Sequence, residues 1–395
     1  MLMLAGGGEA CTDIDHLRGQ DTLFGSVPSA STMYRTITSL SPKLVDDLWS
    51  AMADVRSKMW DRALLTSGDD VVRLDIDATL IDIHSENKQG AEPTYKRGYG
   101  LHPIFIFADA TGETLGAILR PGNASANTVT DHLDLLDQAI GQLPTKIAAG
   151  HRVGNDSNLV ARPVQVRADS AGCTEGFVHG CRARNIGFAV VARRNANIHA
   201  AISNIYVNDA RWQPAQTQTG GLRKGAEVAE ITNLTNLDAW PTGTRLIVRR
   251  EPKHPGAQRS LFPSDNYRYW GHYTDADATV DPVECDRIMR AHAHVEDHIQ
   301  RLKDSGLERM PFSDFDHNAA WTALVAWADT LVRWFQRLTL QGELATANPK
   351  RLRWQLWHTP ARLIYSARRH VMRLLDTWPA TPDLLAAYTR INAIV

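Results

Sequence analysis

The chain has 395 residues, of which 43% are hydrophobic and 22% are charged. This composition is typical of a folded protein and excludes a disordered one, and the length favours two domains or one domain with a large insertion. No apolar stretch is long enough for a membrane span or a signal peptide. The four cysteines form no C-x-x-C pair, so neither a structural zinc nor a disulfide framework is expected.

The formal net charge of −1 conceals an uneven distribution. Residues 1–180 hold 15 Lys and Arg against 23 Asp and Glu, residues 182–268 hold 13 against 6, and the rest is balanced at 15 against 15. A basic block in a neutral chain indicates a local surface for an anionic partner such as nucleic acid. Ordinary solvated surface charge is the alternative.

Apolar patterns predict the following elements in chain order. Ser41-Pro42 has the form of a helix start, and apolar residues then follow helical spacing. Strands are expected at 71–77, 103–108 and 114–119, a helix at 128–143, a strand at 164–168, a helix at 174–182 and a strand at 187–192. This is the element order of a ribonuclease H-like core that still lacks one closing helix.

The next strong helical pattern covers 282–307, and strand patterns at 227–232, 244–250 and 267–273 precede it. Further helical patterns at 315–340, 359–376 and 382–394 finish the chain. We therefore expect an α/β fold with a ribonuclease H-like catalytic core (67–193 and 281–312) that is interrupted by a β-rich insertion (194–280). An N-terminal helical segment (1–66) and a C-terminal helical region (313–395) flank it.

Three acidic residues fall where this topology can bring them together. Asp77 lies near the end of the first strand, Asp169 lies just past the fourth strand, which is adjacent in such a sheet, and Glu296 lies in the closing helix. Hard divalent cations such as Mg²⁺ bind oxygen ligands that converge from separate elements of the fold. Two such cations can activate a water and stabilise the leaving oxygen when a phosphodiester is cut. The pattern predicts two Mg²⁺ ions, for which Mn²⁺ can substitute. Asp75 is the alternative to Asp77 as the first acid, because residues i and i+2 of a strand point the same way. One of these two aspartates is then expected to bind the metal and the other to lie beside it.

Short motifs run along nearly the whole chain: LAGGGE (4–9), DIDAT (75–79), HSENKQGA (84–91), YKRGYGLHP (95–103), LRPGNA (119–124), RADSAG (167–172) and the segment around Glu296. Together they resemble the DDE class of bacterial insertion-sequence transposases, and most closely the insertion sequence thirteen-eighty family. In that family the aspartate of an Asp-x-Thr motif is the first catalytic acid, which falls on Asp77. The second acid falls on Asp169 and the glutamate on Glu296.

The wider group also carries a signature of Tyr, two residues, Arg, three residues, Glu, six residues and Lys. Counting from Glu296 places Lys303 at the lysine position, where the side chain is expected to hold a DNA phosphate. His292 occupies the arginine position and Met289 the tyrosine position, while Arg290 points to another helix face. Histidine can donate to a phosphate but lacks the guanidinium fork.

Other basic residues are predicted to contact DNA. Arg249, Arg250, Lys253 and His254 are expected to form a basic turn on the DNA backbone, and Lys96 and Arg97 to touch phosphate near the site. The tail 350–373 holds seven Lys and Arg, which predicts a second DNA-facing surface.

The resemblance implies a cytoplasmic, nucleoid-associated bacterial transposase that cuts DNA at the ends of an insertion sequence and transfers the strands. Its expected partners are the terminal inverted repeats, target DNA and a second copy of the chain in the DNA complex, without a membrane. The chain begins inside the LAGGGE motif, so the N-terminal segment is expected to be truncated and this copy to be an impaired enzyme or an inactive DNA-binding inhibitor. A plain ribonuclease H-like nuclease without strand transfer is the other alternative.

Overall fold

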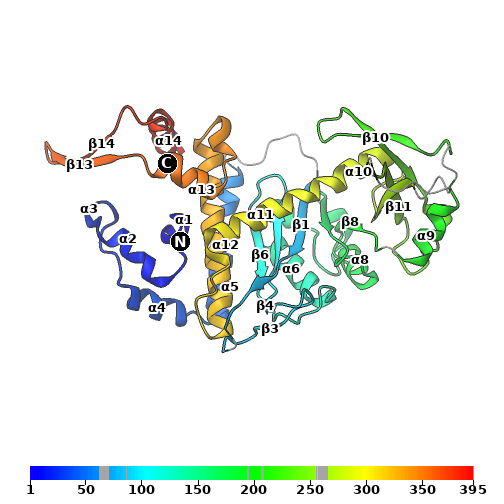
Figure 1. Cartoon of the computed structure of the whole chain (residues 1–395), viewed down its shortest axis with the longest axis horizontal. Coiled ribbons are helices and arrows are strands. Elements are labelled where there is room, and N and C mark those ends of the chain that lie inside the picture. The colour runs from blue at the N-terminus through cyan, green and yellow to red at the C-terminus, as the bar shows by residue number, and fades with distance from the viewer. Residues whose placement is uncertain are drawn as a thin grey trace.

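A long mixed sheet crosses the molecule, with helices against it and around both chain ends (Figure 1). The computed structural model describes residues 1–61, 71–85, 87–193, 195–205, 209–254, 256 and 266–394. The predicted boundary between residues 66 and 67, and the predicted start of the β-rich segment at 194, lie outside the described residues. None of the described helices is both long enough and apolar enough to cross a membrane.

The main sheet has the strand order β6-β5-β1-β7-β8-β12-β11-β10-β9. Within it β1 pairs antiparallel with β5 and parallel with β7, and β7 pairs parallel with β8. The first and fourth core strands are therefore adjacent, as the predicted core requires, and the predicted mixed α/β class is confirmed. The bounds are β1 (Val72–Ala78), β5 (Ile104–Ala108), β6 (Thr114–Ile118), β7 (Val164–Ala168), β8 (Gly187–Val191), α6 (Val129–Gln142) and α8 (Glu175–Arg182).

Strand β5 shows why this sheet is buried on both faces. All five of its residues are buried. Ile104 and Ile106 pack in one apolar cluster with residues of α6, whereas Phe105 and Phe107 pack in another with residues of the closing helix. Because alternate side chains of a strand point to opposite faces, helices must cover both sides of the sheet here.

The β-rich segment extends the core sheet. Strand β12 (Tyr267–Thr274) pairs antiparallel with β8, and β11 (Arg245–Pro252), β10 (Leu222–Glu230) and β9 (Gln213–Gln216) follow outward. These strands form the right-hand end of the molecule in Figure 1, beside α9 (Ala196–Ser203). The three predicted strands of this segment are present, and its description as an insertion remains a prediction.

The closing helix predicted over 282–307 consists of four segments: α10 (Pro282–Arg290), η6 (Ala291–Ala293), α11 (His294–Leu302) and the π-helical η7 (Lys303–Leu307). Asp281 caps its start by accepting a hydrogen bond from the backbone N–H of Val283 at 2.7 Å. Helical geometry stops before the end of η7, because Gly306 has a φ of 100°. The α11 part packs against β1, which brings the closing helix over the first strand.

Helices gather around both ends of the chain. The N-terminal helices include α5, which begins after Ser41 as predicted and whose Trp49 meets Trp327 of α12 edge-to-face at 5.2 Å. The terminal elements are α1 (Leu2–Ala5), η1 (Cys11–Ile14), α2 (Asp15–Arg18), α3 (Asp21–Phe24), α4 (Ala30–Thr38), α5 (Pro42–Met59), α12 (Phe315–Thr339), η8 (Gly342–Ala345), α13 (Pro349–Leu352), η9 (Arg353–Trp357) and α14 (Thr381–Ile394). Shorter elements between core strands are β2 (Ile81–Asp82), β3 (Glu92–Pro93), β4 (Tyr99–Leu101), α7 (Thr145–Ala148) and η3 (Ser157–Leu159), and η4 (Thr232–Leu234) follows β10 in the β-rich segment.

The helix predicted over 359–376 is wrong. This segment forms an antiparallel hairpin of β13 (Ala361–Ser366) and β14 (Arg369–Leu374). Its apolar residues fit helical spacing, but Ala367 and Arg368 have positive φ values of 49° and 61°, which is the backbone of a tight two-residue hairpin turn. The C-terminal region is therefore not purely helical.

Candidate active site

The two acids of β1 lie on the face of the sheet that the closing helix covers. The strand register places Asp75 opposite Phe107 and Asp77 opposite Phe105, and residues directly opposite each other share a face. Both phenylalanines share an apolar cluster with Val295 of α11. The β1 acids consequently lie beneath the helix that carries Glu296.

The charges of the other two predicted acids change the pKa of Asp77. Burial raises the pKa of Asp77, and the negative charges of Asp169 and Glu296 raise it further, to about 6. A hydrogen bond from the backbone N–H of Ala78 at 2.8 Å and the nearby His292 act in the opposite direction. Asp77, Asp169 and Glu296 therefore belong to one electrostatic site.

The three acids do not form a closed metal cage. Among the described residues, no group of three or more His, Cys, Asp or Glu side chains is arranged to hold a metal ion. Asp169 is half-buried just past β7, where its Oδ1 accepts a hydrogen bond from the backbone N–H of Ala171 at 2.8 Å. Glu296 is exposed on the first turn of α11. The donor set is the oxygen-rich kind that Mg²⁺ prefers, but its oxygens are not gathered around one point.

Asp75 has a different environment, because it is fully buried and bound on two sides. Arg167 of β7 donates to both carboxylate oxygens, from Nε at 2.8 Å and from Nη2 at 2.7 Å. The Nδ1 of His292, on η6, lies 2.8 Å from Oδ1. Arg167 also donates from Nη1 to the backbone oxygen of Ile288 at 2.7 Å and pairs with Asp109 at 2.9 Å.

These contacts decide how the two β1 acids differ. Burial alone raises the pKa of Asp75, but the hydrogen bonds from His292 and Arg167 and their charges outweigh it, so the pKa lies below its usual value. Asp75 is thus an ionised structural partner, while Asp77 faces the other two acids. The network also joins β1 and β7 to the helix just before Glu296, which makes it a positioning device for the site.

Sequence reasoning did not identify Arg167 as a residue of this site. The segment 164–168 reads Val-Gln-Val-Arg-Ala, so Arg167 follows the alternation expected of the polar face of a half-buried strand, and the pattern gave no sign that it is buried. The structure buries Arg167, and a buried charge requires a partner of opposite charge. The register supplies that acid, since Arg167 lies directly opposite Asp75.

The signature residues on the closing helix have specific contacts. His292 is buried and its Nδ1 is engaged with Asp75, so this nitrogen does not serve the predicted phosphate contact. Lys303 is partly exposed, 3.7 Å from Glu308, at the first position of the π-helical turn. The α-helix itself ends one residue earlier, at Leu302. A phosphate contact by Lys303 stays a prediction.

The predicted basic turn over 249–254 is partly wrong. Arg249 and Arg250 lie within strand β11. Arg249 pairs with Asp286 at 3.0 Å and lies over the Trp270 ring, and Arg250 pairs with Glu227 at 2.7 Å. Both side chains are largely buried, so their charges are used inside the protein instead of on a DNA backbone.

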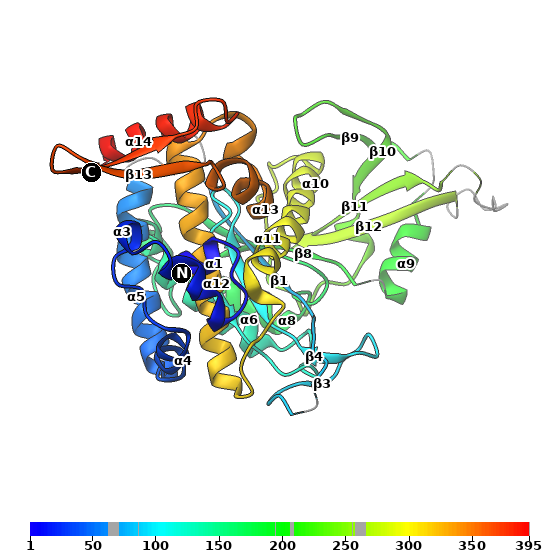
Figure 2. The same cartoon turned by 60° about the vertical axis from the view of Figure 1, so that its left-hand side comes forward.

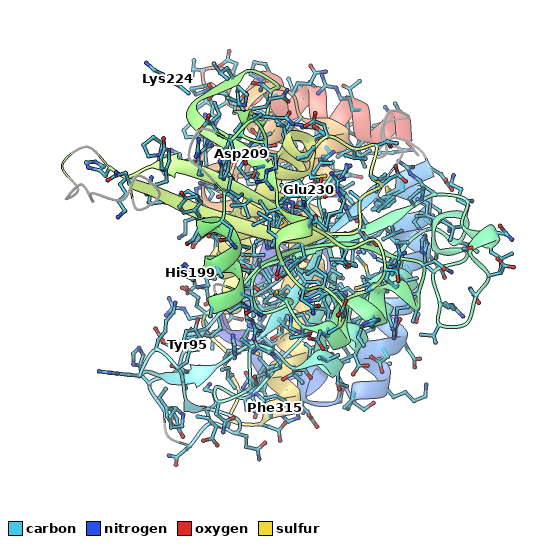
Figure 3. The ribbon with its side chains drawn as sticks, turned by 90° about the vertical axis from the view of Figure 1, so that its right-hand side faces the viewer. Tyr95, His199, Asp209, Lys224, Glu230 and Phe315 are labelled. Carbon is cyan, nitrogen blue, oxygen red and sulfur yellow. The ribbon has the colours of Figure 1, made fainter. Side chains whose placement is uncertain are left out.

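The other predicted phosphate contacts lie on the surface. Lys253 and His254 are exposed just past β11. Lys96 and Arg97 are exposed on the loop between β3 and β4, next to Tyr95. In Figure 3, Tyr95 lies well below Lys224 of β10, which is near the top of the view. Contacts of these four residues with DNA remain predictions.

The family model described as transposase DDE domain group 1 matches residues 1–395. The chain belongs to the DDE transposase domain family. The acids that the family resemblance marked, Asp169 and Glu296, are the ones whose charges act on Asp77. No curated protein matches the chain.

A solved structure shows a distant likeness to this DDE family member. It is the cryo-EM structure of a piggyBac transposase synaptic complex with hairpin DNA, at 11% identity and a TM-score of 0.38. The match covers 72% of this chain and 51% of that chain, so this chain spans about half the length of its counterpart.

Proposed function

We propose that the protein is the transposase of a bacterial insertion sequence of the thirteen-eighty family, which cuts DNA at the terminal inverted repeats and joins the freed strands to target DNA. It acts in the cytoplasm on nucleoid DNA, as a homodimer in the DNA complex. The observation that supports this most is the raised pKa of Asp77, caused by burial and by the charges of Asp169 and Glu296 in a member of the DDE family.

Asp77, Asp169 and Glu296 would hold the divalent cations, with Mg²⁺ as the natural metal and Mn²⁺ as a substitute. When bound, such ions activate a water or a 3′-hydroxyl and stabilise the leaving oxygen of a phosphodiester. Burial and two negative neighbours make ionised Asp77 unfavourable in the metal-free protein, and a cation relieves both penalties. Glu296, which is exposed, would supply the third carboxylate of this ligand set.

The chain's other residues position this site and the DNA. Arg167 and His292 hold Asp75 and through it the strand that carries Asp77. Lys96, Arg97, Lys303 and the pair Lys253 and His254 are proposed to contact phosphates, which places the DNA without reading its sequence.

The test is nicking of supercoiled plasmid DNA by the full chain with Mg²⁺, with Mn²⁺ and with a chelator. Asp169→Asn and Glu296→Gln should each lower the rate roughly 10³-fold, because about 4 kcal/mol of charge stabilisation is lost. Asp297→Asn is the matched control, since Asp297 is exposed on the same first turn as Glu296. Nicking by the Asp169 or Glu296 variants at the wild-type rate would refute the assignment.

A second assay distinguishes a transposase from a plain nuclease of the same fold. Labelled duplexes made from the DNA on each side of the coding sequence, ending in a free 3′-hydroxyl, are incubated with plasmid and Mg²⁺. Joining of label to plasmid supports strand transfer. Nicking without joining supports the nuclease, and binding without either reaction supports the inactive DNA-binding copy.

A further inference from the structure

The hairpin β13–β14 projects from the molecule as a separate arm. It forms its own two-stranded sheet and does not join the main sheet. In Figures 1 and 2 the arm extends outward beside α14, away from the strands of the core. Residues 365 through 373 are exposed in one unbroken run of nine, and Ala361 and Arg362 are exposed as well. Among the described residues no further strand pairs with either outer edge of the hairpin.

The strand register sorts the arm into two unlike faces. Arg362 lies opposite Arg373, and Ser366 lies opposite Arg369. Since directly opposed residues share a face and alternate pairs share it too, these three arginines lie on one side of the ribbon, with the pair Ile364 and Val371 between them. The other side carries the pairs Leu363 with Met372 and Tyr365 with His370.

The arginine face has no internal counter-charge. Residues 361–374 contain four arginines, with Arg368 in the turn, and no Asp or Glu. In the part of the chain that the structure describes, none of the four forms an ion pair with a carboxylate. Like charges directly opposite each other on two strands are destabilising, so the opposed pair Arg362 and Arg373 favours an anion between the two guanidinium groups.

The rest of the predicted basic tail differs from the arm. Lys350 pairs with Asp304 at 2.8 Å, Arg351 pairs with Glu343, and Arg353 donates to the backbone oxygen of Asp304 at 3.0 Å. These three cations are used to attach the tail to the body of the protein. The charge available to an outside partner is therefore concentrated on the hairpin.

We propose that the arginine face of the β13–β14 arm is a DNA-binding ribbon that lies along the phosphate backbone of duplex DNA, an inference that rests on the proposed transposase function. A two-stranded ribbon fits the major groove of B-DNA, which is about 12 Å wide. Arginine forms two parallel hydrogen bonds to a phosphate, and such contacts position a protein on DNA independently of sequence. The arm is distant in sequence from the three acids, so it would give the protein a second DNA-binding surface.

The experiment measures binding of the full chain to a fluorescent 30-base-pair duplex of unrelated sequence, in a chelator, over a range of salt concentrations. The variant Arg362→Gln/Arg369→Gln/Arg373→Gln should bind roughly 30- to 300-fold more weakly, and its plot of log affinity against log salt should be shallower by about 2 to 3. A control with the same charge change is Arg35→Gln/Lys58→Gln/Arg152→Gln, which alters exposed cations on α4, on α5 and in a loop. It should change affinity and slope much less.

A second variant tests the opposite face. Tyr365→Ser/Met372→Ser keeps every arginine and should bind DNA with the wild-type salt slope. Equal loss of DNA binding in the arginine variant and its control would overturn the proposal. So would unchanged DNA binding in the arginine variant together with an altered sedimentation coefficient of the Tyr365 and Met372 variant, because the arm would then be a protein interface.

The proposal and the proposed function can fail separately. Circular dichroism and thermal unfolding show whether each variant is folded. If wild type binds DNA through the arginines but neither nicks nor joins it, the arm is a DNA-binding site and the enzyme assignment fails. If wild type nicks DNA and the arginine variant matches it in affinity and salt slope, the arm proposal alone fails.

Discussion

Replacing Asp77 with asparagine should stabilise the metal-free protein and at the same time abolish its metal-dependent chemistry. Asparagine keeps the shape of the side chain and an oxygen that can accept the hydrogen bond from Ala78. It removes the charge that burial and the neighbouring Asp169 and Glu296 make unfavourable. The charge of Asp77 therefore lowers the stability of the metal-free protein, although the proposed metal-dependent reaction requires it.

The expected gain follows from the pKa of Asp77, which rises from an ordinary value near 4 to about 6. Below about pH 4 the carboxyl is protonated in the folded and the unfolded chain and has no effect. As the pH rises from about 4 to 6, the unfolded chain releases the proton while the folded chain keeps it, so the free energy of unfolding falls. Above about pH 7 the loss is complete at about 3 kcal/mol, and at pH 5 it is about half of that.

The assay is urea denaturation of wild type and Asp77→Asn at pH 5 and pH 8 in a chelator. The variant should be more stable by about 3 kcal/mol at pH 8 and by about half as much at pH 5. In an Asp169→Asn background the same change should gain less, because one repelling charge is already gone. Asp54→Asn, at an exposed position of α5, is the control and should gain nothing.

The reasoning would be refuted by a gain that is equal at both pH values, or by a variant less stable than wild type at pH 8. Addition of Mg²⁺ gives an independent check. It should raise the unfolding temperature of wild type and leave that of Asp77→Asn nearly unchanged, because only a ligand that binds the folded state stabilises it.

Two further changes should alter stability measured by urea denaturation. Arg167→Met removes the main partner of the fully buried Asp75 carboxylate and should lower the free energy of unfolding by about 3–5 kcal/mol. Arg18→Met breaks an exposed ion pair and should lower it by about 0–1 kcal/mol. Equal losses in the two variants would contradict the buried network. Gly122→Ala would place a Cβ 2.1 Å from the backbone oxygen of Gly100 and should cost about 1–3 kcal/mol. Gly141→Ala, which meets nothing within 4 Å near the end of α6, should be neutral or stabilising by up to about 1 kcal/mol; a reversed order would show that the close approach at Gly122 is not maintained.

Much of the core was predictable because its signals are local. Residues 164–168 were predicted as a strand and form β7 over the same span. Ser41-Pro42 was predicted to start a helix, and Ser41 accepts the capping hydrogen bond from the backbone N–H of Leu44 at 3.3 Å. Apolar periodicity and capping involve residues only a few positions apart, so the sequence contains them directly.

Other predictions failed where a distant partner decides the outcome. Arg249 and Arg250 looked like a DNA-facing turn, but acids on α10 and β10 neutralise them within the fold. The segment 361–374 has apolar spacing compatible with a helix, and the two positive-φ residues of its turn decide for a hairpin. Neither ion pairs between separate elements nor backbone conformation at a turn without glycine can be recognised from apolar spacing.

By itself the sequence determined the order of the core elements and the family resemblance, and it predicted the trio Asp77, Asp169 and Glu296. Spacing alone left Asp75 as the alternative to Asp77, because both lie on the same face of one strand, and the resemblance favoured Asp77. Only the tertiary structure showed the physical difference between the two carboxylates. Arg167, 92 residues away, and His292, 217 residues away, neutralise Asp75 and leave Asp77 exposed to the repulsion of the other acids. The role of a carboxylate depends on which charges surround it, and those charges come from elements that only folding brings together.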